Sequence, residues 1–261
     1  MRILFLHLMC CVVLCVSAQS TSTKNASTKN TSTKPTTTKS TVKSTTNSKK
    51  YSFLGSYTMT FEAKDAKGKT TTAAIKSAFD DYKMATLPFF SDQKDVNIRT
   101  VFNVQNNTMT MLIDDVKKKK KSGMVMKMPK VIIANKPYAT DVTYTIKKTT
   151  EKKVIDGYTC YKWIISYSNN DECEAWVTTE LSINTAEAVS YCIAGMKGKQ
   201  SSVNFEAGNV SGATLESLYK AADGSSVSMK LSNIVKGKPS AEFFSENGYD
   251  VIDVTGVQFM K

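Results

Sequence analysis

From residue 51 onward, apolar side chains recur at every second position in one short segment after another, and this alternation is what most constrains the fold. Tyr57, Met59 and Phe61 fall on one face of a first strand in this way. Side chains of an extended chain point alternately to its two sides, so each such segment has one face to bury. Further strands are predicted at residues 98–104, 108–113, 123–129, 142–148, 158–167, 173–179, 214–221, 227–235 and 251–259.

Turn and cap residues separate these segments. Asp156-Gly157 and Asp223-Gly224 predict two-residue hairpin turns, because both positions of each pair tolerate positive φ. One helix is predicted to start at the N-cap Asn184 and to continue through Met196 before Gly198, with Glu187 completing a capping box. Residues 73–84 fit either a helix or a strand.

Export is predicted by the first 18 residues. Arg2 precedes an apolar run that ends in Val16-Ser17-Ala18, which is typical of a cleavable signal peptide at residues 1–18. Residues 19–50 repeat a Thr/Ser/Lys pentapeptide with no apolar side chain larger than valine, and such a segment is typical of a disordered tether. We therefore expect a single domain at residues 51–261, in the periplasm or at the cell surface.

Most of the positive charge lies outside this domain. Of the formal net charge of +12, the leader contributes Arg2 and the tether contributes seven lysines without an acid, which leaves +4 for residues 51–261. We expect the tether to act as a spacer, and the alternative is a polycation that contacts an anionic envelope surface. Within the domain, a lysine run predicts either contact with such a surface or a solvated loop tip: Lys117, Lys118, Lys119, Lys120 and Lys121.

The residue types left after signal cleavage exclude much catalytic chemistry. His7 is the only histidine of the chain, so the mature protein lacks both a histidine-activated nucleophile and a histidine-ligated metal. Arg99 is the only arginine left, so specific nucleic-acid recognition is not expected. We accordingly predict no enzymatic activity, no metal and no cofactor.

Three cysteines remain as disulfide candidates, namely Cys160, Cys173 and Cys192, and they allow one bridge. A two-residue hairpin at Asn169-Asn170 would set Cys160 opposite Thr179, which disfavours a bridge between Cys160 and Cys173. A bridge between Cys160 and Cys192 would join a strand to the predicted helix.

Two segments rich in methionine predict a hairpin with a specific register. One register pairs Met109 with Met128, Met111 with Met126 and Ile113 with Met124, and it places all six side chains on one face. The lysine run would then lie in the connecting loop, Asp114 to Gly123. Flexible thioethers suit an adaptable apolar pocket. Ordinary sheet core is the alternative, and a copper(I) site is a third.

Trp163 and Trp176 lie on two further predicted strands that pair with each other. Aromatic side chains at alternate positions line either a ligand cavity or a packed core. The candidate residues for binding an apolar ligand are therefore Met109, Met111, Ile113, Met124, Met126, Met128, Trp163 and Trp176.

Several of these segments occur in the order found in a known bacterial family. The chain resembles the domain of unknown function 4412 family over most of residues 51–261. The resemblance rests on the segments Thr108–Ile113, Met124–Pro129, Ile155–Trp163 and Glu174–Leu181 and on the ending Ser240–Tyr249. That family resembles the LolA-like outer-membrane lipoprotein carriers, and Arg99 is the one position that can match their cavity arginine.

The resemblance implies a mainly β fold for this chain. In the carriers, a strongly curved antiparallel sheet forms an unclosed barrel that holds acyl chains, with helices as plug or lid. The same architecture is implied here, with one or two helices packed on the sheet and with residues 69–79 in a strand. No activity is implied, because the family has none assigned.

Two functional hypotheses follow from these features. The first is an exported, non-catalytic protein that binds a lipid-like or other apolar ligand, such as an acyl chain, in the curved sheet. The alternative is a structural or adhesion module of the cell surface, whose tether and lysine loop bind acidic envelope polymers.

Overall fold

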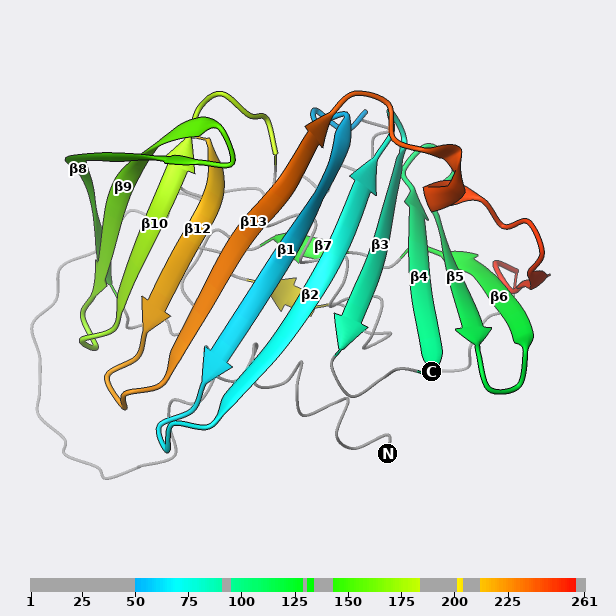
Figure 1. The fold of residues 1–261 in the computed structure, drawn as a ribbon, viewed down its shortest axis with the longest axis horizontal. Helices are drawn as coiled ribbons and strands as arrows, with labels where there is room; N and C mark the ends of the chain where they lie inside the picture. Colours follow the sequence, from blue (N-terminus) through cyan, green and yellow to red (C-terminus); the bar gives the residue numbers. More distant parts are fainter. Residues whose placement is uncertain are drawn as a thin grey trace, which may run out of the picture.

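The fold is that of a large open β-sheet. A computed structural model describes residues 50–90, 95–128, 131–133, 143–183, 201–203 and 212–256. Twelve strands form one sheet in the order β14-β6-β5-β4-β3-β2-β1-β13-β12-β10-β9-β8, with β14 and β8 at its two edges (Figure 1). The sheet is therefore unclosed, as the family resemblance implied.

Strands β1 to β6 form one antiparallel run and β8, β9, β10, β12 and β13 form another, and the pairing of β1 with β13 joins the two runs at the centre of the sheet. A separate pair of short parallel strands, β7 (Val131–Ile133) and β11 (Ser201–Val203), forms a second sheet. The bounds of the main strands are β1 Gly55–Lys64, β2 Thr70–Phe79, β3 Lys83–Phe90, β4 Val96–Asn103, β5 Thr108–Asp115, β6 Lys120–Lys127, β8 Tyr144–Ile155, β9 Tyr158–Tyr167, β10 Glu172–Thr178, β12 Ala213–Lys220, β13 Ser226–Lys236 and β14 Asp250–Asp253.

The alternation of apolar residues predicted most of these strands, but it missed β3, and β14 is shorter than the strand predicted at residues 251–259. Tyr57, Met59 and Phe61 are all buried on one face of β1. Of the ambiguous residues 73–84, residues 73–79 lie in β2, as the family resemblance implied, and residues 83–84 begin β3 after a short turn. The helix predicted from Asn184 lies outside the described residues. Within the described residues, the one helical element is the 3-10 turn η2 (Ala241–Phe244).

Two local predictions need correction. Asp156 and Gly157 both have positive φ and form the expected hairpin turn, but in the β12–β13 connection only Gly224 does. There the turn spans residues 221–225 and is closed by hydrogen bonds from Ala221 N to Ser225 O and from Gly224 N to Ala221 O, so it is longer than predicted. The sheet is also not wholly antiparallel, because β14 pairs in parallel with β6.

The core lies on one face of strands β1–β6 and extends across β13 and β12. A row of directly opposed residues crosses β2 to β5, running through Phe79, Met84, Phe102 and Met109. All four side chains are at most 5% exposed. We call this side of the sheet the methionine face, defined as the face of β1–β6 that carries Met109, Met111, Met124 and Met126.

The opposite face of β3–β6 contacts the C-terminal strap, which we define as residues 237–253. In Figure 1 the strap, in orange to red, leaves the end of β13 and passes β3, β4 and β5 before its last residues pair with β6. Thr110 of β5 donates a hydrogen bond to Glu246 of the strap at 3.0 Å. Val251 of the strap lies beside Gly123, where a Cβ atom would come within 3.0 Å of its side chain.

Candidate functional site

The methionine hairpin β5–β6 forms, but its register differs from the prediction by two residues. Met109 lies opposite Met126, Met111 opposite Met124, and Ile113 opposite Ser122. The strands continue further toward the turn than expected, through Asp114 opposite Lys121 and Asp115 opposite Lys120. These cross-strand pairs of opposite charge favour the tighter register. A shift of two residues preserves the face, so the methionines stay together.

The lysine run is partly neutralised by neighbouring carboxylates. Lys117 pairs with Asp95 at 2.5 Å, Lys118 with Asp115 at 2.9 Å and Lys121 with Asp114 at 3.8 Å. The hydrogen bond from Lys117 to Asp95 raises the pKa of Lys117. No ion pair engages Lys119 or Lys120 within the described part of the chain. Two of the five lysines therefore carry most of the uncompensated charge.

This division gives a test of the anionic-surface hypothesis. Replacing Lys119 and Lys120 by glutamine is expected to lower the salt concentration that elutes the protein from heparin more than replacing Lys117 and Lys118 does. The physical reason is that paired lysines already have their charge compensated. The two double variants have the same net charge, so equal shifts would show that pairing has no influence.

The methionines divide into a buried and a half-buried group. Met109 is 2% exposed and belongs to the main core, and Met126 and Met128 pack against that core with part of their surface exposed. Met111, Met124 and Ile113 are half-buried. Met128 lies just beyond β6, where its N–H donates a hydrogen bond to Asn107 O.

A row of hydroxyl side chains that sequence reasoning missed leads to the half-buried methionines. Ser77 of β2 lies opposite Thr86 of β3, which lies opposite Thr100 of β4, and Thr100 lies opposite Met111. Ser77, Thr86 and Thr100 are 1%, 3% and 9% exposed. Their alternate positions in predicted strands were visible in the sequence, but the register that aligns them was not.

The two tryptophans lie on opposite faces of the β9–β10 pair, so they do not form one site. Trp163 is opposite Ala175 and packs in a small second cluster, whereas Trp176 is opposite Lys162 and packs against the main core. The register differs by one residue from the predicted two-residue hairpin, because residues 168–171 separate the strands and Asn170 takes a positive φ of 69°. A shift of one residue exchanges the two faces.

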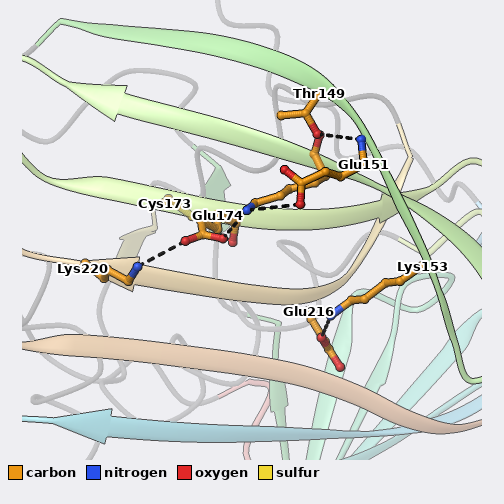
Figure 2. Close-up of polar contacts among 8 residues, drawn as sticks. Thr149, Glu151, Lys153, Cys173, Glu174, Glu216 and Lys220 are labelled. Carbon is orange, nitrogen blue, oxygen red and sulfur yellow. Dashed lines mark hydrogen bonds and ion pairs between the residues drawn. The ribbon is translucent and has the colours of Figure 1, made fainter.

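Strands β8, β9, β10, β12 and β13 carry a lattice of ion pairs (Figure 2). Glu174 accepts from Lys162 at 2.9 Å and from Lys220 at 3.2 Å, and Lys162 also pairs with Glu151. Glu216 pairs with Lys153 and with Lys230. Glu174 is thus held between two lysines of the adjacent strands β9 and β12, whereas Glu216 of β12 is held between Lys230 of the adjacent β13 and Lys153 of the more distant β8.

The lattice predicts an acid-dependent loss of stability. Hydrogen bonds from Lys162 and Lys220 hold the pKa of Glu174 below its ordinary value of 4.5. A carboxylate whose pKa is lower in the folded state stabilises the protein above its unfolded pKa, and this contribution disappears as the pH falls through the folded pKa. We expect the urea midpoint to fall between about pH 5 and about pH 3, and less so in Glu174→Gln. A Glu174→Gln curve parallel to the wild-type curve would contradict this.

Cys160 and Cys173 are buried free thiols, and Cys192 lies outside the described residues. Cys173 is opposite Ile165, which agrees with the prediction that Cys160 and Cys173 do not pair. Burial raises the pKa of Cys160 to about 11 and that of Cys173 to about 12.

These thiols are expected to resist alkylation in the native protein. Relative to an ordinary thiol pKa of 9.0, the raised values lower the thiolate fraction at about pH 8 by about a hundredfold for Cys160 and a thousandfold for Cys173. Iodoacetamide labelling followed by peptide mapping should modify both cysteines only after unfolding. Native labelling of Cys160 at the rate of a free cysteine peptide would contradict the structure.

The described ranges contain neither a candidate metal centre nor a candidate membrane-spanning helix. No group of three or more histidine, cysteine, aspartate or glutamate side chains is placed to hold a metal ion there. In the same residues, no helix has the length and apolar character needed to span a bilayer.

The fold and the site together define an open β-sheet protein with one apolar, thioether-bearing face. The chain belongs to the family described as domain of unknown function (DUF4412), whose sequence profile matches residues 53–246. This confirms the family resemblance read from the sequence. No curated protein matches the chain.

Similar solved structures include two crystal forms of PNGF-II and a LolA superfamily protein from Nitrosomonas europaea. The PNGF-II structures are 18% and 16% identical, with TM-scores of 0.34 and 0.33 over 77% of this chain. The chain spans only 31% and 32% of their length. The LolA superfamily protein is 6% identical, with a TM-score of 0.32 over 77% of this chain and 94% of that protein. Scores this low support no conclusion about function.

Proposed function

We propose that this chain is an exported, non-catalytic binding protein for a lipid-like or other apolar ligand, held at the β4–β6 end of the methionine face. The observation that carries the proposal is the half-buried pair of Met111 and Met124, which continues the buried core toward an accessible edge of the sheet. Thioether side chains are flexible and polarizable, so they adapt to apolar ligands of different shape.

The electrostatics of the face support the same ligand class. Apart from Asp115 and Lys120, which lie opposite each other at the turn end of β5–β6, the aligned positions of this face carry no charged side chain: Tyr57, Met59, Ile75, Ser77, Phe79, Met84, Thr86, Pro88, Ile98, Thr100, Phe102, Met109, Met111, Ile113, Ser122, Met124 and Met126. A charged ligand would lose its hydration there without gaining an ionic partner. The signal peptide proposed for residues 1–18 would deliver the protein out of the cytoplasm, with residues 19–50 as a spacer.

The proposal is tested on the full exported protein, purified without detergent. Native mass spectrometry and lipid extraction should find a co-purified apolar molecule, and an environment-sensitive apolar dye should bind at a saturable site. Met124→Lys should abolish both signals, because it places a charge on the apolar face. Val154→Lys is the matched control, since Val154 is 70% exposed on β8. The absence of a ligand and of saturable dye binding in the wild type would refute the proposal.

A further inference from the structure

The hydroxyl row on the methionine face indicates what kind of apolar molecule fits. Ser77, Thr86 and Thr100 lie side by side on three adjacent strands. Neighbouring strands are about 4.8 Å apart, so the row presents three hydroxyl groups over about 10 Å. It then continues into Met111 and Met124, so the face changes along one line from hydroxyl groups to thioethers.

These hydroxyl groups have hydrogen-bonding capacity to offer. The side chains of Ser77, Thr86 and Thr100 form no hydrogen bond to any other described residue. Their oxygens are also not among the fully buried polar atoms that lack a partner, so each keeps some contact with solvent. A ligand that covers the row displaces water from it, and a hydroxyl then left without a partner costs about 1–3 kcal/mol. A ligand group that donates to or accepts from the row would recover this energy.

We propose that the ligand is a neutral amphiphile, with an uncharged polar group such as a hydroxyl, ester or amide at the Ser77–Thr86–Thr100 row and an apolar chain along Met111 and Met124. This inference rests on the proposed function and narrows its ligand class. The orientation follows from the order of side chains, because polar ligand atoms pair with hydroxyl groups and the chain packs on thioethers.

An anionic head group does not fit this row. A carboxylate or phosphate would be desolvated beside hydroxyl groups alone, without an ion pair. Arg99, the one arginine after the leader, points to the other side of the sheet, where its guanidinium donates to the backbone carbonyls of Glu242 and Ser245 in the strap. It is therefore not available as the anion-binding arginine that the carrier resemblance implied.

The experiment compares three probes that share one chain length, namely tetradecanol, myristate and tetradecane, by displacement of the apolar dye from the full protein. Tetradecanol is expected to bind most tightly. In the Thr86→Val/Thr100→Val double variant, which keeps side-chain shape, its affinity should fall about tenfold while that of tetradecane stays unchanged. Thr60→Val on the exposed side of β1 is the matched control.

A conservative variant separates hydroxyl loss from misfolding. Thr86→Ser keeps the hydroxyl group and should retain tetradecanol affinity, and urea unfolding of each variant reports its stability. Equal binding of tetradecanol and tetradecane, tighter binding of myristate, or an unchanged tetradecanol affinity in the double valine variant would overturn the inference while leaving an apolar site. Binding of none of the three probes would overturn the proposed function itself.

Discussion

Replacement of Phe102 by alanine is expected to lower the free energy of unfolding by about 3–5 kcal/mol. Phe102 is 0% exposed and lies one residue before the end of β4, opposite both Met84 and Met109. Both neighbours are themselves buried within strands, so they have little freedom to move into the space left by the ring. The loss therefore combines the transfer energy of the aromatic ring with the cost of a cavity.

Phe89→Ala is the matched control for this substitution. Phe89 is 52% exposed on β3, and the same change there is expected to cost less than about 0.5 kcal/mol. Urea unfolding followed by tryptophan fluorescence measures both variants. Losses of similar size would show that the buried row through Phe79, Met84, Phe102 and Met109 is not the centre of the core.

The sequence predicted the strands because alternation is a local property. In β1, the positions of Tyr57, Met59 and Phe61 alone decide which face is buried, and the structure confirms them. The Asp156-Gly157 turn is equally local, since two residues with positive φ suffice to close it. The buried face of β1 and the Asp156-Gly157 turn could thus be predicted from neighbouring residues.

Register could not be predicted in the same way. The hairpin of β5 and β6 has two registers that put its methionines on one face, and the observed one brings Asp114 opposite Lys121, with which it forms an ion pair. In β9 and β10 the choice depends on Asn170, whose positive φ lengthens the turn. The candidate site changed accordingly, because Trp163 left the face of Trp176.

The hydroxyl row escaped sequence analysis for a related reason. Ser77, Thr86 and Thr100 are unremarkable within their own strands, and they form a row only because the registers of β2–β3 and β3–β4 align them. The C-terminal strap is a still longer-range feature. Arg99 contacts Glu242 and Ser245, which follow it in the chain by 143 and 146 positions. Such pairings follow from topology, which periodicity does not encode.

Arg99 is the residue that holds the strap most directly. Its two terminal nitrogens donate to the carbonyls of Glu242 and Ser245, and its guanidinium lies 5.6 Å from the ring centre of Tyr249. One planar group thus fixes three positions of the strap, and Thr110 adds a further hydrogen bond to Glu246. Hydrogen bonds from a charged donor contribute more than neutral ones, about 1.5–3 kcal/mol each when buried.

Arg99→Leu is therefore expected to release the strap and to lower its local stability by about 2–3 kcal/mol, because two carbonyls lose a charged donor. Hydrogen exchange should show loss of protection at the amides of Tyr249 and Val254, which bond to Glu246 O and Val125 O, while the amides of β1 stay protected. Arg99→Lys keeps the charge but has no planar fork to reach both carbonyls, so it should restore little of that protection. Full protection in Arg99→Lys would show that charge alone holds the strap, and full protection in Arg99→Leu would show that the contacts of Thr110 and β6 suffice.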